Sequence, residues 1–226
     1  MSSESTKPSS SPVKRRVLIL TAVAAEREAV LRGLAGDPRF DVLEAGVGPA
    51  SAAARTAFAL ATAAYGCVVS AGIGGGFAGR AEIGSLAVAD AIVAADLGAE
   101  TPDGFASVDA LGFGSASAPV DAALAERLAA ALRAAGLPAA SGPVVTVSTV
   151  TGSAASAAAV AARVPGAIAE AMEGFGVATA AAMRGVPCLE LRAISNAVGP
   201  RNRAAWRIPE ALRALEAASA TLKEVL

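Results

Sequence analysis

Short runs of apolar residues alternate along the chain with longer segments in which apolar positions recur at helical spacing. The first run, Val17-Leu18-Ile19-Leu20, predicts a buried strand, and the segment from Ala24 to Leu34 that follows predicts a helix. By the same criteria, further strands are predicted over residues 40–45, 67–71, 84–95, 143–150, 167–172 and 187–194. Strands and helices therefore alternate to the end of the chain, with further helices predicted over residues 50–64, 120–135, 153–164 and 209–225.

This alternation predicts the α/β fold class, with one mixed, mostly parallel central sheet and helices on both of its faces. A chain of 226 residues with 54% hydrophobic residues has enough apolar side chains for one substantial core. Neither an internal repeat nor a second domain is evident, so residues 14–226 are expected to form a single domain. Residues 96–119 mix Gly, Ser, Asp and Phe without a period, and are expected to form a long functional loop.

The amino-terminal segment has the composition of a tail. Residues 1–13 are rich in Ser and Pro and lack the apolar core of a signal peptide, so they are expected to be disordered. The apolar run over residues 17–23 is too short to span a bilayer. We therefore expect a cytoplasmic protein that does not enter a membrane.

Charge and histidine content exclude several classes of function. Nineteen basic and twenty acidic residues give a net charge of -1, which offers little support for nucleic-acid binding and favours a small ligand. The chain has no histidine, which excludes Ser-His-Asp and Cys-His nucleophiles and histidine metal sites. Cys67 and Cys188 are too far apart for a short zinc motif. We expect no metal and no other cofactor, so that carboxylates, amides or water perform any acid–base chemistry.

Polar or flexible residues follow the ends of predicted strands in four places. These are Glu26, the glycine run Gly72-Ile73-Gly74-Gly75-Gly76, Glu173, and Ser195-Asn196. Open α/β sheets bind ligands at the carboxyl ends of their strands. The four elements are therefore expected to meet in one site.

Each of these elements also has a purely structural interpretation. The glycine run serves either as a tight turn or as a place where the backbone, at Gly74 for example, approaches a ligand. Glu26 is also typical of a solvated charge in the first turn of a helix, and Asn196 of a cap or a turn. Glu173 differs, because Ala, Met, Gly and Phe surround it and an acid in an apolar setting needs a partner.

Two longer segments carry a resemblance to a known family. They are Ala171-Met172-Glu173-Gly174-Phe175-Gly176 and Ala193-Ile194-Ser195-Asn196-Ala197-Val198-Gly199-Pro200-Arg201-Asn202-Arg203. With the glycine run and the early Ala22-Val23-Ala24-Ala25-Glu26, they resemble the nucleoside phosphorylase and nucleosidase superfamily, and within it the futalosine hydrolase family. The order and spacing match over residues 17–225. The resemblance implies a three-layer nucleoside phosphorylase-like fold. It also implies an enzyme that hydrolyses futalosine to hypoxanthine and dehypoxanthine futalosine, a step of menaquinone biosynthesis.

The resemblance also implies roles for individual residues. Glu26 matches the glutamate that orients and deprotonates the attacking water. Glu173, beside Met172, matches the carboxylate that accepts hydrogen bonds from ribose hydroxyls and stabilises positive charge at the anomeric carbon. Phe175 would line the base or sugar pocket, although packing in the core is an equally good interpretation for a Phe at a helix start. Because relatives assemble as dimers or larger rings, a homo-oligomer is expected.

Asn196 stands where the methylthioadenosine nucleosidases have an aspartate, and Ser195 would support it. An aspartic acid can protonate N7 of a leaving adenine, whereas an amide donates through its nitrogen and accepts through its oxygen. The amide therefore suits a 6-oxopurine, whose O6 accepts where the amine of adenine donates. Hypoxanthine is the expected leaving base.

Three other functions stay open at this point. They are a purine nucleoside phosphorylase, a methylthioadenosine/S-adenosylhomocysteine nucleosidase, and a non-catalytic nucleoside-binding protein. Glu26 speaks against the phosphorylase, because a carboxylate beside the nucleophile would repel phosphate. Retention of both Glu26 and Glu173 speaks for an enzyme.

The 5′ side of futalosine carries a carboxyphenyl ketone, which needs an apolar channel and a cation. Three arginines that follow Asn196 in the sequence are candidates for this cation, namely Arg201, Arg203 and Arg207. A surface position beside a helix start is the more usual role for an arginine. The loop 96–119, with Phe105 and Phe113, is a candidate to close over the same group.

Overall fold

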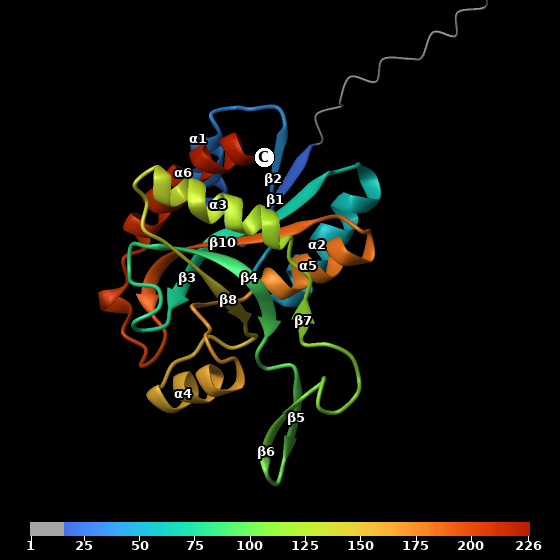
Figure 1. Cartoon of the computed structure of the whole chain (residues 1–226), viewed down its shortest axis with the longest axis vertical. Helices are drawn as coiled ribbons and strands as arrows, with labels where there is room; N and C mark the ends of the chain where they lie inside the picture. The colour runs from blue at the N-terminus through green and yellow to red at the C-terminus, as the bar shows by residue number, and fades with distance from the viewer. Residues whose placement is uncertain (1–15) are drawn as a thin grey trace, which may run out of the picture.

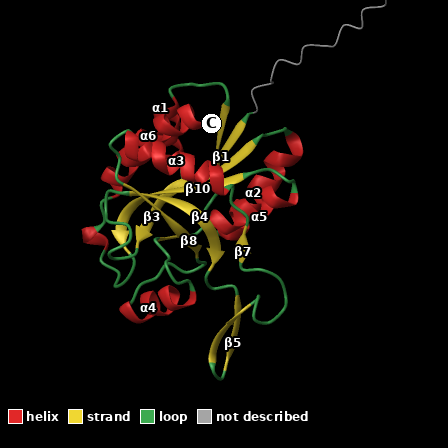
Figure 2. Cartoon of the chain, viewed as in Figure 1, coloured by secondary structure: helices red, strands yellow, loops and turns green. Residues whose placement is uncertain are grey.

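The computed structural model describes residues 16–226, so the tail predicted over residues 1–13 lies outside the described part. At its centre is an eight-stranded sheet with the order β10-β4-β8-β9-β3-β1-β2, to which β7 is added through β4 (Figures 1 and 2). The main strands are β1 (Val17–Thr21), β2 (Phe40–Glu44), β3 (Cys67–Gly76), β4 (Leu86–Ala94), β8 (Ala139–Thr146), β9 (Ala169–Ala171) and β10 (Cys188–Ala197).

The strand pairings are mixed and mostly parallel, as predicted. Five pairs are parallel, namely β1–β2, β1–β3, β3–β10, β4–β8 and β8–β9. Three are antiparallel, namely β4–β10, β3–β9 and β4–β7. Because β10 pairs with both β3 and β4, the strands β3, β9, β8, β4 and β10 form a closed ring of pairings from which β1 and β2 extend.

Helices cover both faces of the sheet and confirm the three-layer α/β fold class (Figure 1). One face carries α1 (Ala24–Leu34), α3 (Ala122–Ala134) and α6 (Ile208–Val225). The other face carries α2 (Pro49–Thr62) and α5 (Gly174–Met183). A third apolar cluster lies under α4 (Ala154–Arg163), whose buried residue is Val160. Within residues 16–226, no helix combines the length and the apolar character needed to cross a bilayer.

The central position of β1 explains its unbroken apolar sequence. All five of its residues are buried, and alternate side chains enter different core clusters. Ile19 packs beneath α1 and α6, whereas Leu18 and Leu20 pack on the side of α2 and α5. A strand covered on both faces reads as a continuous hydrophobic run. Complete burial of each such aliphatic side chain stabilises the fold by about 1.5–3 kcal/mol.

The glycine run differs from its prediction, because it continues β3 instead of ending it. The strand was predicted over residues 67–71 and extends to Gly76. Glycine is needed there for space: a Cβ at Gly76 would lie 2.0 Å from the carbonyl oxygen of Ala81, and one at Gly74 would lie 2.9 Å from that of Glu170. Neighbouring backbone thus packs directly against this end of β3.

Residues 96–119 also differ from the predicted loop, because they contain short strands. β5 (Gly98–Thr101) and β6 (Gly104–Ser107) form an antiparallel hairpin that extends away from the body of the protein (Figure 1). β7 (Ser117–Ala118) then returns to the edge of β4. None of the residues in β5 and β6 is buried. Neither strand therefore needs the alternation of apolar and polar residues by which a half-buried strand is predicted from a sequence.

Candidate active site

A cavity of about 300 Å³ lies where β1, β3, β9 and β10 reach their carboxyl ends. The apolar part of its wall is formed by Val47, Val150 and Trp206, which the sequence analysis did not predict as site residues. The cavity brings together six of the predicted site residues: Glu26, Gly74, Met172, Glu173, Ser195 and Asn196. Residues more than a hundred positions apart in the sequence therefore face one space.

Glu26 lies in the first turn of α1, directly after β1. Its Oε2 accepts hydrogen bonds from the N–H groups of Ala22 at 2.9 Å and Val23 at 3.3 Å, and its Oε1 accepts one from Ile73 at 2.8 Å. Burial raises the pKa of Glu26, while the Ile73 N–H and the charge of Arg192 oppose this rise. The carboxylate is fixed in position and holds a proton more readily than an exposed glutamate.

Glu173 is the N-cap residue of α5, at its junction with β9. Its Oε1 accepts a hydrogen bond from the N–H of Gly48 at 3.3 Å, and its Oε2 accepts one from the N–H of Met172 at 3.3 Å. Oε2 also forms an ion pair with Nη1 of Arg192 at 3.2 Å. The amino terminus of the helix adds a favourable field for this negative charge. The partner that an acid in apolar surroundings needs is thus an arginine.

Arg192 is the main residue of the site to which the sequence analysis gave no role, although it directly precedes the Ala193–Arg203 segment of the resemblance. It lies on β10, is 1% exposed, and uses all three guanidinium nitrogens: Nη1 contacts Glu173, Nε contacts Oε1 of Glu190 at 2.9 Å, and Nη2 donates to Oγ of Ser70 at 2.7 Å. A signal was present, since charged and apolar residues alternate over residues 189–192 of a strand predicted to be buried. Two charges on one face of such a strand indicate a buried ion pair.

Ser195 and Asn196 form a polar pair at the end of β10. The hydroxyl of Ser195 donates to Oδ1 of Asn196 at 2.8 Å and lies 3.2 Å from the carbonyl oxygen of Gly74. The Nδ2 of Asn196 donates to the carbonyl oxygen of Ala197 at 3.0 Å. An amide nitrogen has two hydrogens, so Asn196 keeps one N–H for a ligand in the cavity.

Phe175 lies outside the cavity lining, contrary to its predicted place in the substrate pocket. Its side chain packs against the apolar cluster between the sheet and the helices α2 and α5. Its N–H donates to Oγ1 of Thr146 at 2.9 Å, which fixes the first turn of α5 over β8. The rotation of the helix at this turn directs Glu173 to the cavity and Phe175 to the core.

Neither phenylalanine of the candidate closing loop lines the cavity. Phe105 lies on the β5–β6 hairpin, where its ring stacks under the guanidinium of Arg163 at 4.0 Å. Phe113 is 82% exposed.

The segment after Asn196 does reach the cavity, through Trp206. The guanidinium groups of Arg201 and Arg203 lie 5.3 and 5.9 Å from the centre of the Trp206 ring. Arg207 acts instead as the N-cap residue of α6, and its N–H donates to the carbonyl oxygen of Ser195 at 2.8 Å. Two of the three candidate arginines thus lie beside a tryptophan of the cavity wall, although neither of them lines the cavity itself.

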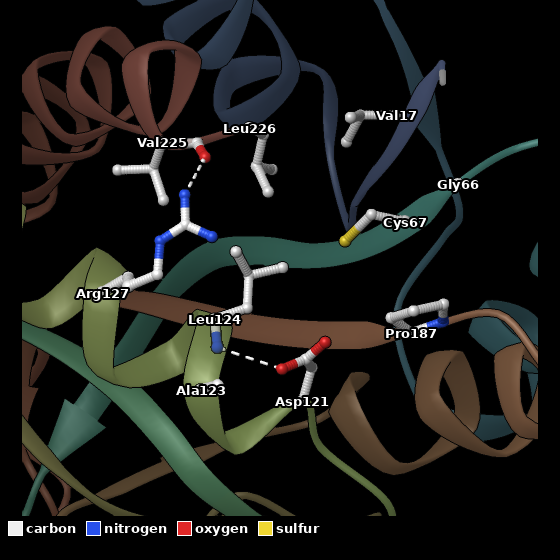
Figure 3. Close-up of a pocket in the computed structure, with 10 residues that line it drawn as sticks. All are labelled: Val17, Gly66, Cys67, Asp121, Ala123, Leu124, Arg127, Pro187, Val225 and Leu226. Atoms are coloured by element: carbon white, nitrogen blue, oxygen red, sulfur yellow. Dashed lines mark hydrogen bonds between the residues drawn. The ribbon is translucent and has the colours of Figure 1, made fainter. Parts of the chain in front are cut away.

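A larger hollow, of about 450 Å³, lies at the opposite ends of β1, β3 and β10 (Figure 3). Its side chains include Cys67, Asp121 and Arg127, of which Asp121 caps α3 and Arg127 donates to the carbonyl oxygen of Val225 at 3.0 Å. Burial raises the pKa of Cys67 to about 12, so this thiol is not reactive near neutral pH. These polar groups are already satisfied, and we assign the chemistry to the smaller cavity. Within residues 16–226, no group of three or more potential metal ligands gathers.

Comparison with known sequences identifies close relatives. Residues 19–226 match the family model of the phosphorylase superfamily. The chain is 56% identical over 230 residues to the futalosine hydrolase of Streptomyces coelicolor, covering 93% of this chain and 96% of that protein. It is 50% identical to the futalosine hydrolase of Acidothermus cellulolyticus, covering 93% of this chain and 90% of the relative.

Solved structures share the fold at lower sequence identity. A futalosine hydrolase mutant of Helicobacter pylori superposes with a TM-score of 0.81 at 16% identity, over 94% of this chain and 100% of that chain. A 5′-methylthioadenosine/S-adenosylhomocysteine nucleosidase of Neisseria meningitidis, in complex with methylthio-immucillin-A, superposes with a TM-score of 0.78 at 21% identity. That match covers 93% of this chain and 98% of the other.

Proposed function

The chain belongs to the futalosine hydrolases of the phosphorylase superfamily, and we propose that it hydrolyses the N-glycosidic bond of futalosine, releasing hypoxanthine and dehypoxanthine futalosine. One observation carries this proposal from the structure. Two of the three buried carboxylates that line the cavity, Glu26 and Glu173, share it with the amide of Asn196. That set supplies a base for water, an anion for the sugar and a hydrogen-bonding group for the purine. The reaction serves menaquinone biosynthesis.

Glu26 is the general base. Its ionised carboxylate accepts a proton from water, whose oxygen then bonds to the anomeric carbon of the ribose. The C–N bond breaks in the same reaction and its electron pair leaves with the purine, which takes up a proton from solvent to become hypoxanthine. Glu26 then returns the proton it took from water to solvent, which restores the base. Three backbone N–H groups hold the carboxylate, so it does not need to reorganise during the reaction.

Glu173 binds the ribose hydroxyls, with Met172 beside it in the wall. A carboxylate accepts hydrogen bonds from hydroxyls, and its charge stabilises the positive charge that develops on the sugar ring as the base departs. The contacts to Gly48 and Arg192 keep this carboxylate facing the cavity.

Asn196 binds the departing purine, and Ser195 orients it. The hydroxyl of Ser195 occupies Oδ1 of Asn196, which supports a free amide N–H as the group offered to the ligand. Such a donor suits an acceptor on the purine, such as O6 of hypoxanthine. The neutral amide also favours a 6-oxopurine over adenine, as expected from the sequence. Gly74 allows the close approach of β3 to this end of the cavity.

The wall around Trp206 supports recognition of the carboxyphenyl group on the 5′ side of futalosine. The indole ring offers an apolar surface on which an aryl group can stack. Arg201 and Arg203 lie against the same ring and supply cations for a carboxylate. A methylthio group would use neither guanidinium, so this wall favours futalosine over 5′-methylthioadenosine.

A panel of nucleosides tests the proposal. Purified protein is incubated with futalosine, inosine and 5′-methylthioadenosine, with and without phosphate, and the free bases are separated by chromatography. We expect rapid release of hypoxanthine from futalosine at a rate independent of phosphate. Phosphate dependence would indicate a nucleoside phosphorylase, preference for 5′-methylthioadenosine would indicate the other nucleosidase, and binding without release would indicate a non-catalytic protein.

We also propose that the protein is a cytoplasmic homo-oligomer, a dimer or larger. The exposure of α4 supports assembly. Val160 is the one buried residue of this alanine-rich helix, so its other small side chains are free to contact a second copy of the chain. Cys67 and Cys188 are free thiols, which suits a reducing compartment. Light scattering coupled to gel filtration tests the assembly, and a mass of 22.0 kDa in solution would contradict it.

A further inference from the structure

Glu190 is a buried carboxylate that has no role in the reaction described above. It lies on β10 two residues before Arg192, is 0% exposed, and does not line the cavity. Its Oε1 accepts a hydrogen bond from Nε of Arg192 at 2.9 Å. Its Oε2 has no hydrogen-bond partner among residues 16–226. A buried charge that is only partly satisfied disfavours folding, so its presence calls for a reason.

The fold makes room for Glu190 at the start of α5. Gly174 is the first residue of that helix, and a Cβ at this position would lie 2.1 Å from Oε2 and 2.4 Å from Oε1 of Glu190. Any side chain at position 174 would displace the carboxylate. The amino terminus of α5 therefore faces two carboxylates, that of Glu190 and that of Glu173, its N-cap residue.

Three carboxylates surround the single guanidinium of Arg192. Glu173 and Glu190 contact it directly, and Glu26 lies near enough for its pKa to respond to the same positive charge. A Cβ at Gly72 would lie 2.6 Å from Oε1 of Glu26 and 2.8 Å from Nη1 of Arg192, which shows how closely these groups converge. Cys188, also on β10, is a further titratable group near Glu190, since burial and the charge of Glu190 both raise the pKa of its thiol.

The charge balance decides what Glu173 can do for the sugar. If Glu173 were the only carboxylate on Arg192, the guanidinium would neutralise it and weaken its attraction for a positively charged sugar ring. Burial raises the pKa of Glu190, but the charge of Arg192 and its hydrogen bond oppose this rise and favour the ionised form. With Glu190 ionised, the pair Glu190–Arg192 is neutral by itself, so the charge of Glu173 remains effective. The guanidinium still holds Glu173 through one nitrogen, while Nε and Nη2 are occupied by Glu190 and Ser70.

We propose that Glu190 is a positioning residue that neutralises and orients Arg192, so that Glu173 keeps its negative charge for the sugar in the transition state. The inference rests on the proposed function, since it assigns the sugar to Glu173. It concerns a residue buried behind the cavity, which acts on the substrate only through Arg192 and Glu173.

The test is Glu190→Gln, which keeps the size of the side chain and an oxygen for Nε of Arg192 but removes the charge. We expect kcat for futalosine to fall about tenfold to a hundredfold, because an electrostatic contribution to the transition state is lost. KM should stay within about threefold of the wild-type value, because ground-state contacts remain. A kcat equal to that of the wild type would overturn the proposal, since glutamine would then mimic a Glu190 that carries no charge.

The pH profile separates a charge effect from a packing defect. Without Glu190 the charge of Arg192 is less compensated, so the pKa of Glu26 falls and the acid limb of kcat/KM moves to lower pH. A slower enzyme with an unshifted acid limb would show a structural role only and would overturn the proposal. The control is Glu126→Gln, an exposed position on α3, which should change neither quantity.

Two further variants keep the test decisive if Glu190→Gln does not fold. Glu190→Asp retains the charge, so its acid limb should stay at the wild-type pH even if kcat falls; a shifted limb would overturn the proposal. In a Glu173→Gln background, a further change at Glu190 should alter kcat by less than about twofold, because the two residues act on one interaction. If the two substitutions instead lowered kcat by the product of their separate effects, the proposal would be overturned. Failure of the proposed function would show separately, as wild-type protein that releases no hypoxanthine from futalosine.

Discussion

Replacement of Glu26 by glutamine removes the proposed base while it keeps the size of the side chain. In the wild type both carboxylate oxygens accept hydrogen bonds, Oε2 from Ala22 and Val23 and Oε1 from Ile73. A glutamine has one oxygen and one NH₂ group. Its oxygen should face the two donors at Ala22 and Val23, which leaves the NH₂ group opposite the N–H of Ile73.

Both stability and rate should change by amounts that follow from this geometry. A buried donor left unpaired costs about 1–3 kcal/mol. For a domain of this size each kcal/mol lowers Tm by about 2–4 °C, so Tm should fall by about 2–12 °C. The amide of glutamine cannot take a proton from water, so kcat should fall about a hundredfold to ten-thousandfold.

The assay separates binding from turnover. Release of hypoxanthine from futalosine gives kcat, and the fluorescence of Trp206, the sole tryptophan and part of the cavity wall, gives substrate affinity. Affinity of the Glu26→Gln variant should stay within about threefold of the wild-type value. Glu28→Gln is the matched control, because Glu28 lies on the same helix and is exposed. Wild-type turnover by Glu26→Gln would refute the assignment of Glu26 as the base.

Three further results are expected from the same site. Asn196→Asp should shift the ratio of kcat/KM toward adenine nucleosides by about tenfold to a hundredfold, because a carboxylate facing O6 is a mismatched pair; an unchanged ratio would argue against Asn196 at the base. Trp206→Leu should raise KM for futalosine about tenfold and leave KM for inosine unchanged, which kinetics on both substrates would check. Burial raises the pKa of Glu26 above 4.5, the ordinary value for a glutamate, and only the ionised form is a base. Activity should therefore decline as pH falls through that raised pKa, and full kcat/KM at pH 4.5 would contradict this.

The sequence predicted the layers of the fold because most strands are buried on both faces. The run over residues 17–20 is apolar for that reason, and helical spacing marks the segments between the strands. The hairpin over residues 98–107 escaped prediction because exposed strands need no apolar face. The strand over residues 67–71 was predicted to end too early, because glycine serves turns and close-packed strands equally well and the glycine run continues β3 to Gly76.

The candidate site was predictable where chemistry follows the end of a strand. Glu26, Glu173 and Asn196 fit that rule, and all three line the cavity. Trp206 does not, since it follows the short 3-10 turn Arg203–Ala205 in a segment without a period. Phe175 was misplaced because sequence spacing does not fix the rotation of a helix about its axis.

The need of Glu173 for a charged partner could be predicted from the sequence, but the identity of that partner could not. The residues around it are small or apolar, which leaves the carboxylate dependent on a partner. That partner, Arg192, lies nineteen positions further along the chain and meets it only in the folded state. Long-range ion pairs of this kind follow from the three-dimensional arrangement of strands, which one sequence does not specify.

The most direct measurement is the fate of oxygen from water during cleavage of futalosine. The reaction is run in water labelled with a heavy oxygen isotope, in the presence of phosphate, and the products are weighed by mass spectrometry. We expect the label in dehypoxanthine futalosine, none in hypoxanthine, and no phosphorylated sugar. A sugar 1-phosphate without label, or intact futalosine after long incubation, would contradict hydrolysis by this protein.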